Sequence, residues 1–198
     1  MNKKNSRDLV GYGSKGKKIS WPNNAKLALQ IVLNYEEGGE NSPLNGDQYS
    51  ETFLSEIIGA KAIRGRHISM ESIYEYGSRS GFWRLDKLFR EKKIPITIFG
   101  VGLALKQNPQ VCDAIKKGNY EIAAHGYRWI DYQDVKKSVE KKHMQLAIKT
   151  IKNIFGSRPL GWYTGRCSPN TRDLVFNEGG FLYDSDSYSD DLPYWEFR

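Results

Sequence analysis

Two adjacent carboxylates, Glu36 and Glu37, directly follow a short, mostly apolar run at residues 27–34 (LALQIVLN) and its closing tyrosine. Gly38 and Gly39 come next in the sequence. Neighbouring carboxylates are costly to place together, because each charge disfavours ionisation of the other group. That cost is acceptable where one carboxylate is a general base and the other binds or orients a substrate. The pair is therefore a candidate catalytic site, although a solvated acidic loop would have the same composition.

His125 occupies a similar position after the run at residues 120–124 (YEIAA), in a turn that contains Gly126. A lone histidine is more often structural, but the C-terminal end of a strand favours a role in proton transfer. Arg166 follows residues 160–163 in the same way. An arginine there can orient a carboxylate, and the alternative is a surface ion pair that contributes little to stability.

A fourth polar cluster, at residues 185–191 (SDSYSDD), follows the run at residues 181–184. Its Asp186 and Tyr188 could bind polar atoms of a substrate, or the cluster could be only a turn. Polar groups at these four strand ends favour one convergent active site over four unrelated surface features.

The elements that position these residues alternate between strands and helices, which predicts an α/β fold with a parallel sheet. If the sheet closes, it forms a TIM-like barrel with active residues at the C-terminal strand ends; the open alternative is a doubly wound sheet. Residues 35–79 are expected to form a long functional loop. The patterns predict strands at 27–34, 94–99, 120–124, 160–163 and 181–184, and helices at 81–93, 101–117 with a second segment from Pro109, 131–155 capped by Asp131, and 170–178 capped by Asn170.

Composition indicates one globular domain at residues 27–198, preceded by an irregular lead-in at residues 1–26. The net charge is +7, and six lysines between Lys136 and Lys152 are expected to form the solvated face of a helix. No nucleic-acid motif accompanies this charge, so we expect no nucleic-acid partner. Two distant cysteines, no secretory signal and no membrane-spanning run favour a cytoplasmic protein without a membrane partner.

Three motifs resemble those of the polysaccharide deacetylase (NodB-homology) superfamily. Residues 34–38 (NYEEG) match its Thr-Phe-Asp-Asp-Gly motif, residues 125–129 (HGYRW) its His-Ser/Thr-x-x-His motif, and residues 166–169 (RCSP) its Arg-x-x-Pro motif. Longer stretches are similar to the metal-independent allantoinases of uric-acid catabolism, and the resemblance covers nearly the whole chain after about Gly11. These stretches are NYEEGGENS, RHISMESIYEYGSRSGFWRL, AAHGYRW, GWYTGRCSPNTR and YDSDSYSDDLPYW.

The resemblance implies a distorted (β/α) TIM-like barrel of the NodB-homology type. It also implies a hydrolase that acts on non-peptide C–N amide bonds and opens the hydantoin ring of allantoin to give allantoate. Glu36 aligns with the catalytic base that activates a water molecule, with Glu37 and His125 orienting that water or the substrate. Arg166 is expected to pair with Glu36 and hold it ionised. Expected substrate contacts are Trp129, which would stack on a flat ring, and Tyr163, Asp186 and Tyr188.

Two departures from the deacetylase pattern bear on a metal cofactor. Deacetylases of this superfamily hold a divalent metal with Asp, His and His, but this chain has Glu37 and Trp129 at two of those positions. Tryptophan has no lone pair for a metal, and one imidazole with one carboxylate makes a poor zinc site. We therefore predict no metal cofactor, unless the protein is instead a carbohydrate or peptidoglycan N-deacetylase of the same superfamily.

A third departure is length, because family members are longer than this chain. The resemblance predicts an incomplete barrel of about five of seven strands, without the family's final histidine motif, which would supply the leaving-group acid. An open sheet edge makes association plausible. The expected partners are an allantoin-like cyclic amide and either a second copy or a complementing C-terminal chain. The remaining alternative is an inactive remnant or a binding subunit.

Overall fold

The structure is a computed structural model, and it describes residues 7–197. These residues divide into two compact units. One unit contains residues 31–186 and holds the sheet. The other combines residues 7–30 with residues 187–197 and contains one 3-10 turn, η1 (Pro22–Asn24). Within this second unit the Tyr12 hydroxyl donates a hydrogen bond to Asp191 over 3.3 Å.

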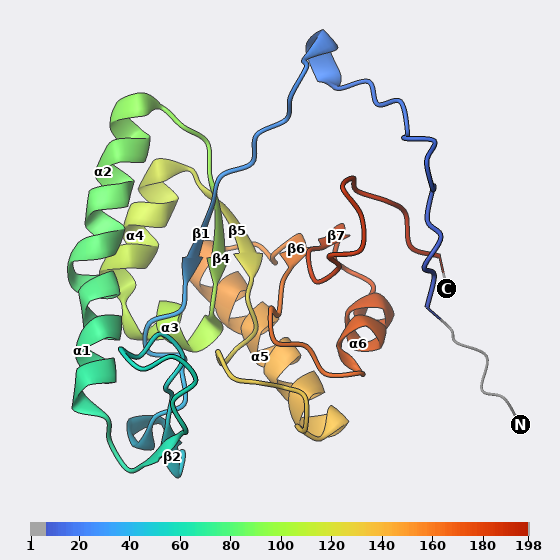
Figure 1. Ribbon diagram of the computed structural model, residues 1–198. Helices are drawn as coiled ribbons and strands as arrows, with labels where there is room; N and C mark the ends of the chain where they lie inside the picture. The colour runs from blue at the N-terminus through green and yellow to red at the C-terminus, as the bar shows by residue number, and fades with distance from the viewer. Residues whose placement is uncertain (1–6, 198) are drawn as a thin grey trace, which may run out of the picture. The chain divides into compact units, whose positions relative to one another are not determined.

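Residues 31–186 contain a five-stranded parallel sheet in the order β1-β4-β5-β6-β7 (Figure 1). The predicted α/β class with a parallel sheet is therefore confirmed. The first strand begins later than expected, since pairing with β4 starts only at Val32. The strands are β1 (Val32–Tyr35), β4 (Thr97–Gly100), β5 (Glu121–Ala124), β6 (Gly161–Trp162) and β7 (Tyr183–Asp184).

After β4, three helices follow their predicted boundaries closely, and a fourth ends at its predicted residue. Pro109 opens α4 (Pro109–Gly118), and the Asn108 side chain caps it by accepting a hydrogen bond from the Val111 N–H. Gly156 ends α5 (Lys137–Phe155) with a left-handed φ of 84°. The others are α3 (Gly102–Gln107) and α6 (Thr171–Glu178).

Both predicted side-chain caps are wrong. Asp131 accepts a hydrogen bond from the Gln133 N–H, so it closes a local turn, and α5 begins only at Lys137. Asn170 stands at the N-cap position of α6 but makes no capping bond with its side chain. The Ser168 N–H instead donates to the Thr171 hydroxyl, and the Asn170 N–H donates to the Ser168 hydroxyl.

The predicted loop at residues 35–79 is wrong over its last part, residues 68–79. Helix α1 (Ile68–Tyr76) continues through the π-helical turn η3 (Gly77–Gly81) into α2 (Phe82–Lys92). The sequence GSRSG between them has poor helix propensity, which hides this continuity. Residues 36–67 do hold a loop, braced by η2 (Pro43–Asn45) and by an antiparallel pair, β2 (Tyr49–Ser50) and β3 (Ile63–Arg64).

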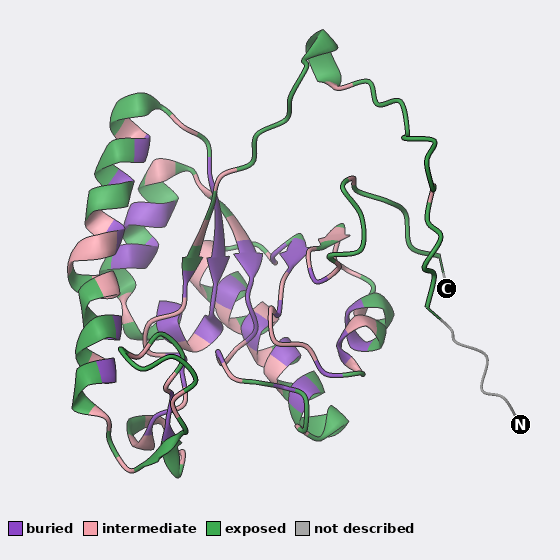
Figure 2. Ribbon diagram, viewed as in Figure 1, coloured by how far each residue is buried: buried purple, intermediate pink, exposed green. Residues whose placement is uncertain are grey.

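Helices cover one face of the sheet and form the core with it. Ile98, Ala124 and Trp162 belong to the hydrophobic core shared with the helices, which buries residues such as Ile115 and Ile151 (Figure 2). On α2, Phe82 and Phe89 are buried, whereas Leu85 and Leu88 are more than a third exposed. On α5, Met144, Ala147 and Ile151 are buried, whereas Val139 is exposed.

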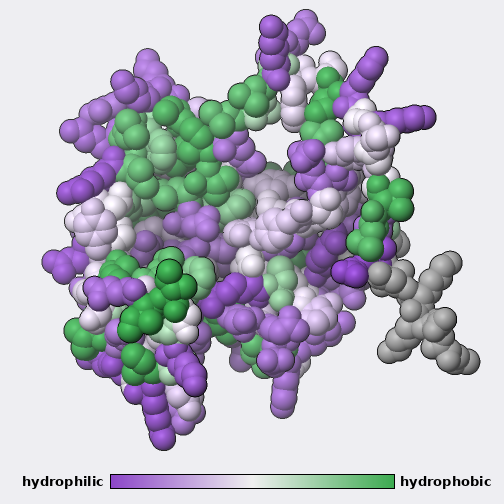
Figure 3. Space-filling model, in the orientation of Figure 1, coloured by the Kyte–Doolittle hydropathy of each residue, from purple (hydrophilic) through white to green (hydrophobic). Residues whose placement is uncertain are grey.

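The surface of the described residues includes a group of exposed lysines and an exposed apolar segment. The six lysines between Lys136 and Lys152 are all exposed, as predicted for a solvated helix face. The segment between β2 and β3 exposes apolar side chains, and Figure 3 shows hydrophobic surface over this part of the chain. They are Phe53, Leu54, Ile57 and Ile58.

None of the described helices combines the length and the apolar character that crossing a membrane requires.

Candidate active site

Three of the predicted site residues meet at the C-terminal ends of neighbouring strands. Tyr35 and Ala124 are both in register with Gly100, and Ala124 is in register with Trp162. Each next residue points to the opposite face of the sheet, because side chains alternate along a strand. Tyr35, Ala124 and Trp162 lie in the helix-covered core. The residues that follow them are Glu36, His125 and Tyr163, and these three lie together on the other face.

Glu36 and His125 are in direct contact. Nε2 of His125 lies 2.9 Å from Oε1 of Glu36, and Nδ1 lies 2.8 Å from the backbone carbonyl oxygen of Tyr163. The imidazole is 2% exposed and stacks on the Tyr163 ring, with centroids 4.8 Å apart and planes 10° apart. The Asn34 side-chain amide donates to the same Glu36 oxygen over 2.9 Å. The histidine is thus fixed in position by both ring nitrogens.

These contacts determine how many protons the pair holds. The Tyr163 carbonyl can only accept, so Nδ1 of His125 must carry a hydrogen. The 2.9 Å contact between Nε2 and the Glu36 carboxyl then contains one further proton, on either the nitrogen or the oxygen. The other Glu36 oxygen, Oε2, accepts no hydrogen bond within residues 7–197, so it is free to take a proton from water.

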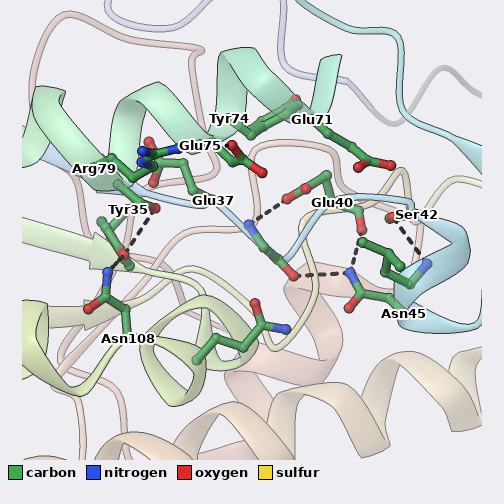
Figure 4. A pocket seen from close by; sticks show the side chains of 14 residues that line it. Tyr35, Glu37, Glu40, Ser42, Asn45, Glu71, Tyr74, Glu75, Arg79 and Asn108 are labelled. Carbon is green, nitrogen blue, oxygen red and sulfur yellow. Dashed lines mark hydrogen bonds and ion pairs between the residues drawn. The ribbon is translucent and has the colours of Figure 1, made fainter. Parts of the chain in front are cut away.

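Glu37 points away from this pair. Its carboxylate accepts a hydrogen bond from the Glu36 N–H over 3.1 Å and lies against Gly77, where any side chain would collide with it. It lines a pocket of about 330 Å³ between the loop after β1 and helix α1, together with Glu40 and Tyr74 (Figure 4). Burial is the main cause that raises the pKa of Glu37 above the ordinary glutamate value. The two adjacent carboxylates therefore lie in different surroundings: Glu36 contacts His125, and Glu37 lies in the pocket beside α1.

The predicted pairing of Arg166 with Glu36 is wrong. Nη2 of Arg166 donates to Oε2 of Glu51 over 2.8 Å, and the guanidinium lies 4.1 Å from the centroid of the Trp129 ring. Glu51 is buried, and its other oxygen accepts the N–H groups of Thr52 and Phe53. Sequence reasoning missed Glu51 because it lies in the predicted loop, and no local pattern links it to a residue so distant in the chain.

The predicted substrate contacts have mixed outcomes. Trp129 is buried, and Arg166 rather than a flat substrate ring covers one face of its indole. Asp186 accepts hydrogen bonds from the N–H groups of Thr164 and Gly165, so it orders the loop after β6. Tyr163 lies at the centre, against His125. Tyr188 belongs to the other compact unit, so its position relative to the site is not defined.

The residues at the expected metal-ligand positions do not fit a divalent metal. The Glu37 carboxylate lies in the pocket beside α1, and Trp129 is packed between Arg166 and the rings of Phe53 and Tyr74. Within residues 7–197, no three His, Cys, Asp or Glu side chains are grouped so that they could hold a metal ion. No catalytic step through a metal follows from this arrangement.

Comparisons with known proteins place the fold and the site in a family. A family model described as polysaccharide deacetylase matches residues 66–174, more than half of the chain. The chain is 42% identical to a Schizosaccharomyces pombe protein assigned provisionally as a polysaccharide deacetylase, covering 96% of this chain and 62% of that protein.

Two solved structures agree with this placement and with the expected barrel type. PuuE allantoinase and a Pseudomonas aeruginosa PAO1 protein, assigned provisionally as a polysaccharide deacetylase, are each 55% identical to this chain, with a TM-score of 0.92. Each match covers 97% of this chain and 64% of the other, so the chain spans less than two thirds of the length of these relatives. The sequence, the fold and the three motifs lead to one conclusion: the chain belongs to the polysaccharide deacetylase family.

Proposed function

We propose that the protein hydrolyses a C–N bond of a cyclic amide, with Glu36 as the general base, and that allantoin is the substrate and allantoate the product. The single observation that carries this proposal is the Glu36–His125 pair, in which one Glu36 oxygen makes two hydrogen bonds and the other makes none within residues 7–197. The 55% identity to PuuE allantoinase supports the choice of substrate.

The reaction needs a base that later returns its proton, and the geometry of Glu36 suits both steps. Oε2 of Glu36 takes a proton from water while the water oxygen bonds to a ring carbonyl carbon, which gives a tetrahedral intermediate. The C–N bond then breaks, and the departing nitrogen receives the proton from Glu36. Throughout, His125 and Asn34 keep their hydrogen bonds to Oε1 and stabilise the carboxylate each time it forms. One water is consumed, and Glu36 ends in its starting state.

His125 has a supporting role in this scheme. Its Nδ1–H bond to the Tyr163 carbonyl fixes the ring so that Nε2 can face only Glu36. His125 and Asn34, rather than Arg166, are the side chains that make hydrogen bonds to Glu36. The proposed steps use only these side chains and water, and none of them needs a metal ion.

Removal of an N-acetyl group from an amino sugar is the second candidate, favoured by the provisional names of the Schizosaccharomyces pombe and Pseudomonas aeruginosa relatives. The test is to incubate the purified protein with allantoin and, separately, with an N-acetylglucosamine oligomer, each with and without EDTA. Allantoate formation that survives EDTA is the expected result. Acetate release that EDTA abolishes would replace the proposal with the second candidate. A folded protein that acts on neither compound would show that this chain alone is not the enzyme.

A further inference from the structure

One side chain, Arg128, links the loop that carries Glu36 to the loop that carries His125. Its Nε donates to the Gly39 carbonyl oxygen over 3.0 Å, and its Nη2 donates to the Glu40 carbonyl oxygen over 3.0 Å. The same Nη2 forms an ion pair with Oδ2 of Asp47 at 2.5 Å. Three groups of the loop after β1 therefore converge on one guanidinium from the loop after β5.

The surroundings of Arg128 make this link stiff. Its side chain is only 12% exposed, so water competes weakly for these donors. Asp47 is itself held, because Oδ2 also accepts the Ser42 N–H over 2.8 Å. A guanidinium has a planar fork of donors that can serve several acceptors at once, which the single ammonium of lysine cannot reproduce. The contact therefore depends on arginine specifically and not on positive charge alone.

Both ends of the link lie close in sequence to the reacting pair. Gly39 follows Glu36 in the same turn, where the Gly39 N–H donates to the Glu36 carbonyl over 2.8 Å. Arg128 follows His125 in the turn made by Gly126, which has a φ of 72°. A backbone bond from the Trp129 N–H to the Gly39 carbonyl oxygen runs beside the side-chain link. Movement of either loop would thus change the separation of Glu36 and His125.

We propose that Arg128, anchored by Asp47, is a positioning residue that sets the contact between Glu36 and His125. It does not touch the reacting atoms, and it acts through the two loops that carry them. The contact exists whether or not the protein turns over allantoin. It can therefore be measured apart from activity, and only the kinetic part of the test rests on the proposed function.

The test is a double-mutant cycle read by nuclear magnetic resonance of ¹⁵N-labelled histidine. The chain has three histidines, so the signals of His67 and His143 can be assigned by substitution with glutamine. Glu36→Gln should move the His125 Nε2 resonance, because it removes the charged partner. In the Arg128→Lys background, at the same pH, the same substitution should move that resonance by less than about half as much.

Arg158→Lys is the matched control, because Arg158 also forms an ion pair, with Glu178 at 2.6 Å, away from the two loops. In that background, Glu36→Gln should move the His125 resonance by the wild-type amount. If Arg128→Lys does not fold, Asp47→Asn replaces it, since this change keeps both bonds to carbonyl oxygens and weakens only the anchor. Asp47→Asn should reduce the shift in the same direction, by less.

A kinetic arm uses the same variants. With allantoin, Arg128→Lys should lower kcat much more than it raises KM, because it disturbs the base and not the substrate contacts. An undiminished Glu36→Gln shift in both the Arg128→Lys and Asp47→Asn backgrounds would overturn the proposal. The wild-type protein could fail to turn over allantoin while the Glu36→Gln shift is still reduced in the Arg128→Lys background. That result would overturn the proposed function and leave the positioning role standing.

Discussion

Nε2 of His125 lies 2.9 Å from Oε1 of Glu36, while its other ring nitrogen faces a carbonyl oxygen that can only accept. Because of this arrangement the two side chains fix each other's position and act as a unit. Glu36 therefore has one oxygen that is fixed by the protein and one that is open to water.

Asn34 should be important for activity, although it is exposed and was assigned no role from sequence. Asn34→Asp removes the donor to Oε1 of Glu36 and places a second carboxylate beside it. Hydrogen bonds to charged groups contribute about 1.5–3 kcal/mol, and the exposure of Asn34 reduces this contribution. We therefore expect kcat to fall by about tenfold or more. Steady-state kinetics with allantoin measure this. Asn34→Asp with wild-type kcat would show that the amide does not support the base.

Glu37→Gln should stabilise the protein in a pH-dependent way. Burial raises the pKa of Glu37 in the folded protein, so ionisation costs more in the folded state than in the unfolded state. The wild-type protein therefore loses stability as the pH rises from the pKa of Glu37 in the unfolded protein, about 4.3, through its higher pKa in the folded protein. The Tm of Glu37→Gln should match wild type near pH 4 and exceed it at neutral pH.

Glu91→Gln is the control for this effect, since Glu91 is exposed on α2. Its thermal unfolding should follow wild type at every pH. A Glu37→Gln variant whose Tm difference from wild type is the same at acidic and neutral pH would contradict the assignment of a raised pKa to Glu37.

Arg166→Lys should destabilise the protein by about 1–2 kcal/mol in chemical denaturation. Lysine cannot place a flat cation on the Trp129 ring while also pairing with the buried Glu51 carboxylate. Arg79→Lys is the control, because its ion pair with Glu75 is exposed and should change stability by less than about 0.5 kcal/mol. Equal effects of the two substitutions would argue against a structural role for Arg166.

Gly77→Ala should destabilise the protein even though alanine normally favours a helix by about 0.5–1 kcal/mol over glycine. A Cβ at position 77 would collide with the Glu37 carboxylate and displace it from the Glu36 N–H. Gly81 lies in the same π-helical turn, and a Cβ there would meet nothing closer than 3.7 Å. Gly81→Ala should therefore be neutral or stabilising. Urea denaturation of both variants provides the comparison, and a stabilised Gly77→Ala would contradict the close approach of Glu37.

Periodic patterns and strand-end motifs predicted much of the fold and the centre of the site. Apolar runs located all five strands of the parallel sheet, and the residues after three of them, Glu36, His125 and Tyr163, do meet. This succeeded because side-chain alternation and parallel register are local rules that carry over directly into space. The helix at Ile68–Tyr76 was missed because the glycines and serines that follow it resemble a loop.

The partners of charged groups could not be read from the sequence. Arg166 was assigned to Glu36 by motif, but Glu51 lies closer because the β2–β3 hairpin carries it to the guanidinium. Asp186 was expected to face a substrate, yet it accepts backbone N–H groups of the neighbouring loop. In both cases the choice among several possible partners depends on tertiary packing, which no spacing in the sequence encodes.

The most direct test of the central claim is the rate of allantoate formation by Glu36→Gln, measured in EDTA beside wild type and the exposed control Glu91→Gln. General-base catalysis contributes about 10²–10⁴-fold, so Glu36→Gln should lose at least about 100-fold in kcat while its Tm stays close to wild type. Glu91→Gln should retain the wild-type rate. A Glu36→Gln protein that still forms allantoate within a few-fold of the wild-type rate would contradict the assignment of Glu36 as the base.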